Sequence, residues 1–95
     1  MSTLLDLIAT NRDEAEDAST AIVGDSVYVR YANDLAVLKI TARPGAVGET
    51  NVTLQLIHPD HGPIDSADFV HTRTQSPVVV LERLDAYQDI WQIGC

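Results

Sequence analysis

The sequence predicts an all-β fold, a six- to seven-stranded β-sandwich preceded by a short N-terminal helical arm. From Ala21 to Ile93, short runs rich in Val, Ile, Thr and Tyr alternate with Gly, Pro, Asn and Asp. Such spacing of strand and turn residues is typical of two-sheet sandwiches. The 95 residues suffice for one hydrophobic core. We therefore expect a helical, acidic arm over residues 1–19 and a β-sandwich domain over residues 20–95.

The N-terminal segment has the features of a helix. Thr3 and Asp6 are spaced as a capping box. The acidic run after Arg12 would place negative charge at the unfavourable end of the helix dipole, so the helix should end near that residue. The apolar residues between them share a helical face. This face is predicted to dock on a partner through Leu4, Leu5, Leu7 and Ile8.

Seven segments are predicted to be strands: 21–23, 26–31, 35–42, 50–57, 69–74, 78–84 and 87–93. Two stretches within them, Leu35–Leu38 and Val78–Leu81, are apolar on both faces. Only the inner face of a sandwich strand meets the core, so the outer face requires another cover. This predicts association through Leu35, Val37, Val78 and Val80, although scattered apolar side chains on a surface are a common alternative.

Charge excludes two classes of partner. The formal net charge is −8, and Lys39 and five arginines are scattered along the chain. Nucleic-acid binding needs clustered cations, and an anionic membrane surface would repel such a chain. No apolar run approaches the ~18 residues that span a bilayer. The N-terminus has no basic region before its apolar residues, which predicts cytoplasmic synthesis. The single Cys95 excludes an intrachain disulfide.

Motifs for catalysis or a cofactor are not recognisable, so we expect no enzyme and no cofactor. The serines lack a nucleophile elbow, and the glycines before residue 50 precede a strand instead of a phosphate-binding helix. One cluster contains metal-ligand residue types, and it predicts at most a zinc or copper site. Its candidate ligands are His58, Asp60, His61 and His71. A solvated turn around Pro59 and Gly62 is the alternative.

The stretch Arg43–Ile64 reads Arg-Pro-Gly-Ala-Val-Gly, then Val-Thr-Leu-Gln-Leu, then Asp-His-Gly-Pro-Ile. It resembles immunoglobulin-like sandwiches found in phage structural proteins and in bacterial copper-handling modules. One methionine and three histidines count against a copper module. The strands apolar on both faces, the amphipathic arm and the lack of catalytic motifs predict a non-enzymatic subunit of a larger assembly. The resemblance implies a virion component, such as a capsid decoration (cement) or connector protein. We expect protein partners, through self-association or a larger assembly, and the alternative function is a small metal- or ligand-binding module.

Overall fold

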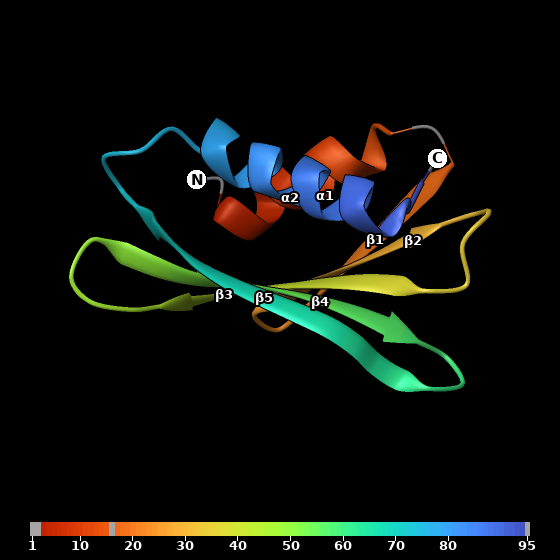
Figure 1. Cartoon of the computed structure of the whole chain (residues 1–95). Coiled ribbons are helices and arrows are strands. Elements are labelled where there is room, and N and C mark those ends of the chain that lie inside the picture. Colours follow the sequence, from red (N-terminus) through yellow and green to blue (C-terminus); the bar gives the residue numbers. More distant parts are fainter. Residues whose placement is uncertain (1–2, 16, 95) are drawn as a thin grey trace.

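A computed structural model describes residues 3–15 and 17–94, which fold into a helix layer and a sheet layer (Figure 1). The elements in chain order are α1 (Leu4–Asp13), β1 (Ala18–Val23), β2 (Ser26–Tyr31), β3 (Val37–Pro44), β4 (Glu49–His58), β5 (Gly62–Thr72) and α2 (Val78–Trp91). The five strands form one antiparallel sheet in the order β1-β2-β3-β4-β5. Both helices lie on the same face of this sheet (Figure 1).

The predicted six- to seven-stranded sandwich is therefore wrong. The five strands belong to one open sheet, and the two segments predicted as the last strands, 78–84 and 87–93, both fall largely within α2. The run Val78–Leu81 has the composition of a strand. However, the buried Val80, Leu84 and Tyr87 are spaced by four and three residues, so a helix places them on one face. Burial of that face against the sheet overrides the local strand preference.

The predicted N-terminal helix is confirmed. Thr3 Oγ1 accepts a hydrogen bond from the Asp6 backbone N–H at 3.1 Å, and Asp6 Oδ2 accepts one from the Thr3 N–H at 3.1 Å. This capping box satisfies donors that the first helical turn leaves without an intrahelical partner. Helix α1 packs on the sheet and contributes the fully buried Ile8 to the core. The sequence suggested a boundary between arm and domain at residues 19 and 20, and residues from both sides of it share one core.

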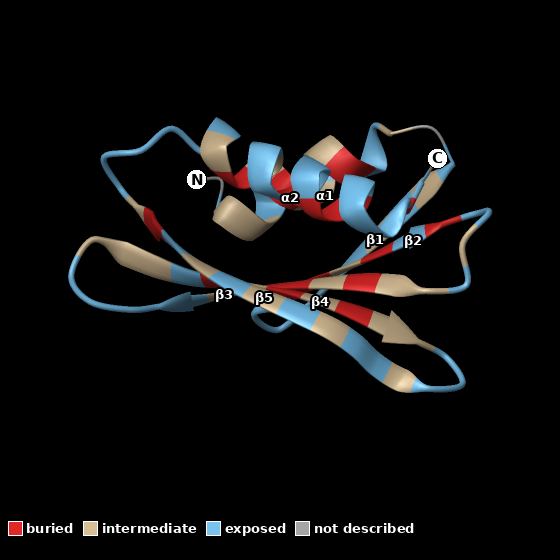
Figure 2. Cartoon of the chain, in the orientation of Figure 1, coloured by how far each residue is buried: buried red, intermediate tan, exposed pale blue. Residues whose placement is uncertain are grey.

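The core lies between the helices and one face of the sheet. Cross-strand register sets Val27 beside Ile40 and Ile40 beside Leu54, and all three are buried. A parallel row contains Val29, Leu38 and Leu56. These rows belong to the same core cluster as Ile8 and Leu84 of the helices, so they face the helix layer. Figure 2 colours parts of the central strands as buried. Alternation along each strand sends the residues between them to the opposite face.

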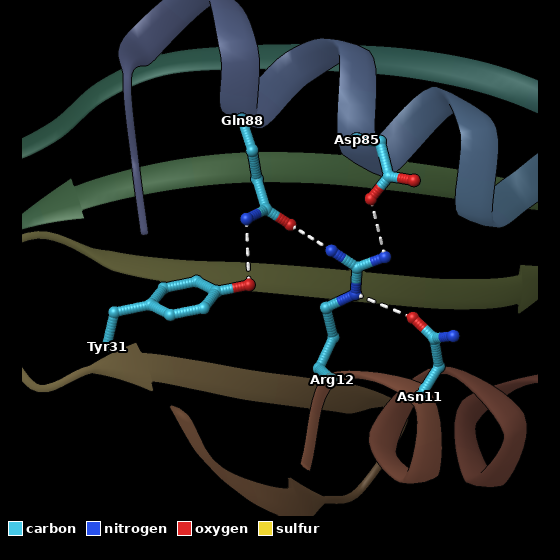
Figure 3. Close-up of polar contacts among 5 residues, drawn as sticks. All are labelled: Asn11, Arg12, Tyr31, Asp85 and Gln88. Atoms are coloured by element: carbon cyan, nitrogen blue, oxygen red, sulfur yellow. Dashed lines mark hydrogen bonds and ion pairs between the residues drawn. The ribbon is translucent and has the colours of Figure 1, made fainter. Parts of the chain in front are cut away.

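A buried polar network joins the two helices to β2 (Figure 3). Arg12 of α1 donates from Nη2 to Asp85 Oδ1 at 2.7 Å and from Nη1 to Gln88 Oε1, both in α2. Its Nε donates to Asn11 Oδ1 at 3.0 Å. Gln88 Nε2 in turn donates to the Tyr31 hydroxyl at 2.7 Å. The network therefore fixes α1, α2 and the end of β2 relative to one another.

A matched pair of leucines tests the position of α2. Leu84 of α2 is fully buried, whereas Leu35 is 74% exposed. We expect Leu84→Ala to lower the free energy of unfolding by about 2–5 kcal/mol, since it leaves a cavity against the sheet. Leu35→Ala should change it by less than about 0.5 kcal/mol. Urea denaturation followed by circular dichroism measures both, and equal effects would contradict the helix packing described above.

Candidate interaction surface

The sheet face opposite the helices is left uncovered by the described parts of the chain, residues 3–15 and 17–94 (Figure 1). The strand register defines its two central rows. One row sets Tyr28 beside Lys39, with Gln55 next along β4. The other contains Arg30, Val37 and Ile57. Because these residues alternate with the core rows along each strand, their side chains point away from the helices. We call this surface the open face.

A shallow groove of about 460 Å³ runs over the open face beside β1. Its lining is mostly aliphatic and aromatic, with a single cation, and carries neither a carboxylate nor an imidazole that could serve as a general base. The lining residues are Ser19, Thr20, Ala21, Val23, Tyr28, Arg30, Val37 and Ile57. A groove of this depth and composition suits the side chains of a protein partner better than the chemistry of an active site.

The open face is also where the chain gathers its positive charge. Arg30, Lys39 and Arg43 lie on it, three of the six Lys and Arg residues in the sequence, and the exposed Asp68 of β5 lies on the same face opposite Thr53. Lys39 Nζ lies 5.6 Å from the centroid of the Tyr28 ring, within cation–π range. Arg43 Nε forms an ion pair with Asp25 Oδ2 at 2.7 Å. The cationic side chains therefore flank the apolar groove.

The helix layer has the opposite charge. Helices α1 and α2 contain two bases against five acids: Arg12 is buried, and the exposed Arg83 lies over the Phe69 ring at 5.2 Å from its centroid. The exposed acids of these helices are Asp6, Asp13, Glu82, Asp85 and Asp89. The helix layer is therefore net acidic, whereas the part of the open face around the groove carries the cations Arg30 and Lys39.

A second polar cluster attaches α2 to β5. Asp65 Oδ2 accepts hydrogen bonds from the Tyr87 hydroxyl at 2.9 Å and from Trp91 Nε1 at 3.2 Å. Burial raises the pKa of the Tyr87 phenol, and the Asp65 carboxylate raises it further. The phenol therefore stays protonated and continues to donate to Asp65. The sequence predicted a strand over residues 87–93, whereas Tyr87 and Trp91 lie one turn apart on α2.

The predicted metal ligands do not come together. His58 and His61 lie at the β4–β5 turn with ring centroids 4.7 Å apart, and the Asp60 N–H donates to His58 Nδ1 at 3.1 Å. His71 is near the other end of β5, about 30 Å away at ~3.3 Å per strand residue. It is buried, and its Nε2 lies 3.3 Å from the Ser76 carbonyl oxygen. Within residues 3–15 and 17–94, no group of three or more His, Cys, Asp or Glu side chains could hold a metal ion.

The predicted interface residues separate into three groups. Ile8 and Val80 are fully buried core residues, which removes them from any surface of the folded chain. The half-buried residues of α1 lie against the core or beside a hollow of about 530 Å³ near His71 and Arg73; they are Leu4, Leu5 and Leu7. Leu35 and Val78 are exposed, and Val37 lies in the open-face groove.

Sequence reasoning did not single out Tyr28, Arg30, Lys39 or Ile57. The signal for three of them was present, because Tyr28 and Arg30 alternate with buried β2 residues and Lys39 shares a face of β3 with Val37. Only the cross-strand register shows that these side chains are neighbours.

Comparisons with known proteins find no matching family, no matching curated protein and no matching solved structure. Among the described residues, no helix is both long and apolar enough to cross a bilayer.

The ion pair beside the open face predicts a pH dependence of stability. The hydrogen bond from Arg43 lowers the pKa of Asp25 below its usual 3.8. A carboxylate with a depressed pKa stabilises the fold above its unfolded-state pKa, and this contribution is lost as pH falls through the folded value. We expect Asp25→Asn to reduce the fall in urea midpoint as pH drops below about 5. Arg43→Gln should give the same flattened profile, and an unchanged profile in both variants would contradict the ion pair.

Proposed function

We propose that this chain is a non-enzymatic structural subunit of a protein assembly and that its open face is the contact surface for an acidic protein surface. The observation that carries the proposal is the difference in charge between the groove side of the open face and the net acidic helix layer. An apolar groove flanked by Arg30, Lys39 and Arg43 lies on one side, and exposed carboxylates lie on the other. Interfaces commonly combine a central apolar patch with charges that match the partner.

A second copy of this chain supplies a partner with the required chemistry. Its helix layer bears five exposed acids against two bases, of which Arg12 is buried and paired with one of those acids, Asp85. Stacking the helix layer of one copy on the open face of the next brings unlike charges together. Such a contact joins two different surfaces, so it can continue from copy to copy. The proposal can therefore be tested on the purified chain alone, by measuring its self-association.

The virion assignment was based on a predicted fold that differs from the observed one. It followed from a resemblance to immunoglobulin-like sandwiches, whereas the strands form one open sheet with helices on a single face. The metal-binding alternative is likewise without a supporting arrangement, because His71 lies far from His58 and His61. The open face instead favours an interaction subunit of unspecified assembly type.

The experiment compares two changes of surface charge. Arg30→Glu reverses a charge on the open face, and Arg73→Glu reverses that of an exposed arginine just after β5, away from the open-face rows. Sedimentation velocity at rising protein concentration should show self-association of the wild-type chain that weakens with added salt, because the charges are solvent-exposed. We expect Arg30→Glu to weaken association by about tenfold or more. Arg73→Glu should leave it nearly unchanged.

Two results would contradict this function. The first is a wild-type chain that remains monomeric at every concentration and salt level tested. The second is association that responds equally to the open-face variant and to Arg73→Glu, because this would indicate a general effect of net charge. Far-UV circular dichroism confirms that each variant keeps the wild-type secondary structure.

A further inference from the structure

The two edges of the sheet differ in how they are protected against pairing with another strand. Natural edge strands carry charges, prolines or bulges that prevent such pairing. The edge strand β5 contains Pro63, Asp65 and Asp68, and its pairing with β4 is interrupted by a register shift at Leu56/Ile57. The other edge strand, β1, reads Ala-Ser-Thr-Ala-Ile-Val and contains no charge, proline or glycine.

The hydrogen-bond pattern shows which groups of β1 remain free. The Ala32 N–H donates to the Asp17 carbonyl at 2.8 Å, so Asp17 belongs to a hydrogen-bonded pair. Such pairs alternate along antiparallel strands, and the register makes Ser19, Ala21 and Val23 the residues that bond to β2. The backbone N–H and C=O groups of Thr20 and Ile22 therefore point toward the open edge. Ala18 differs, because its N–H is taken by the Ala15 carbonyl at 3.4 Å.

We infer that β1 pairs with β1 of a second copy, antiparallel and about a two-fold axis. A two-fold axis perpendicular to a strand always generates an antiparallel neighbour, so one exposed edge serves both copies. An axis at Ala21 sets Thr20 opposite Ile22 of the second copy, and Ile22 opposite its Thr20. This register uses the backbone groups that are free in the isolated chain and avoids the occupied N–H of Ala18.

Side chains at the edge favour a second copy as the occupant. Ile22 and Val23 are 47% and 62% exposed, and pairing would cover both. Strand β1 contains no charged side chain, so pairing two β1 strands brings no like charges together within the strand. Beyond its ends, the register brings Asp17 toward Asp25 of the second copy. Asp25 already has Arg43 at 2.7 Å as a counter-ion, which reduces that repulsion.

Pairing of this kind also affects the groove on the open face. Ser19, Ala21 and Val23 line the groove from the β1 side. Joining two β1 strands would place the grooves of both copies on one continuous sheet, on either side of the axis. The dimer would therefore present a doubled groove without covering the cationic residues of the open face. This inference is independent of the stacking proposed above, which uses a different surface.

Matched proline variants at the two edges test the pairing. Thr20→Pro removes an outward N–H of β1. Ser66→Pro removes an outward N–H of β5, since the bond from the Arg73 N–H to the Gly48 carbonyl at 2.9 Å sets the alternation there. Edge strands tolerate proline at outward positions. In 0.5 M salt, chosen to weaken stacking, we expect a wild-type dimer that Thr20→Pro weakens by about tenfold or more and Ser66→Pro leaves intact.

A cross-linking measurement keeps the inference testable if a proline variant fails to fold. In a Cys95→Ser background, Ala21→Cys places a thiol at the proposed axis, where facing residues come within disulfide range. Mild oxidation should yield a covalent dimer from this variant and not from Ser66→Cys in the same background. Equal cross-linking of the two, or none in either, would overturn the inference, as would a monomeric wild-type chain. Arg30→Glu with Lys39→Glu should leave the cross-link unchanged, so this pairing and the stacking can fail separately.

Discussion

The buried guanidinium of Arg12 links the two helices to each other and, through Gln88, to the sheet. A guanidinium removed from water needs hydrogen-bond partners, because a buried charge left unsatisfied destabilises the fold. The partners of Arg12 are Asp85 and Gln88 on α2, and Gln88 also bonds the Tyr31 hydroxyl at the end of β2. Neither helix can shift across the sheet without leaving this charge unsatisfied. The network therefore fixes the two helices relative to each other on the apolar face of the sheet, where Ile8 and Leu84 are fully buried.

How far the fold could be predicted depended on whether the deciding contacts were local. The capping box of Thr3 and Asp6 and the Gly24-Asp25 turn are local, and the structure contains both, with Gly24 at φ +62°. The α2 segment was mistaken for strands because its β-branched beginning resembles one, although the spacing of Val80, Leu84 and Tyr87 fits a helix. The number of layers could not be predicted, since a strand with one apolar face looks the same in a sandwich and under a helix layer.

The candidate surface was predictable only in part for a related reason. Val37 was identified because Leu35–Leu38 is apolar on both faces, and it does line the groove. Its cationic neighbours went unnoticed, because Tyr28 and Lys39 become neighbours only through the pairing of β2 with β3. The histidines were instead grouped wrongly. Closeness in sequence suggested one ligand set, but an extended β5 separates His71 from the turn that holds His58 and His61.

The strand order has a consequence for how the chain folds. Each strand pairs with its neighbour in sequence, so hairpins can close over short loops at low entropic cost. The contact between Arg12 and Gln88 instead joins residues 76 apart in the chain. We therefore expect the five-stranded sheet to form early and the two helices to dock on it late. During that interval both faces of the sheet are exposed, and the inner one is far more apolar. Folding yield, more than native stability, should then depend on how quickly α2 docks.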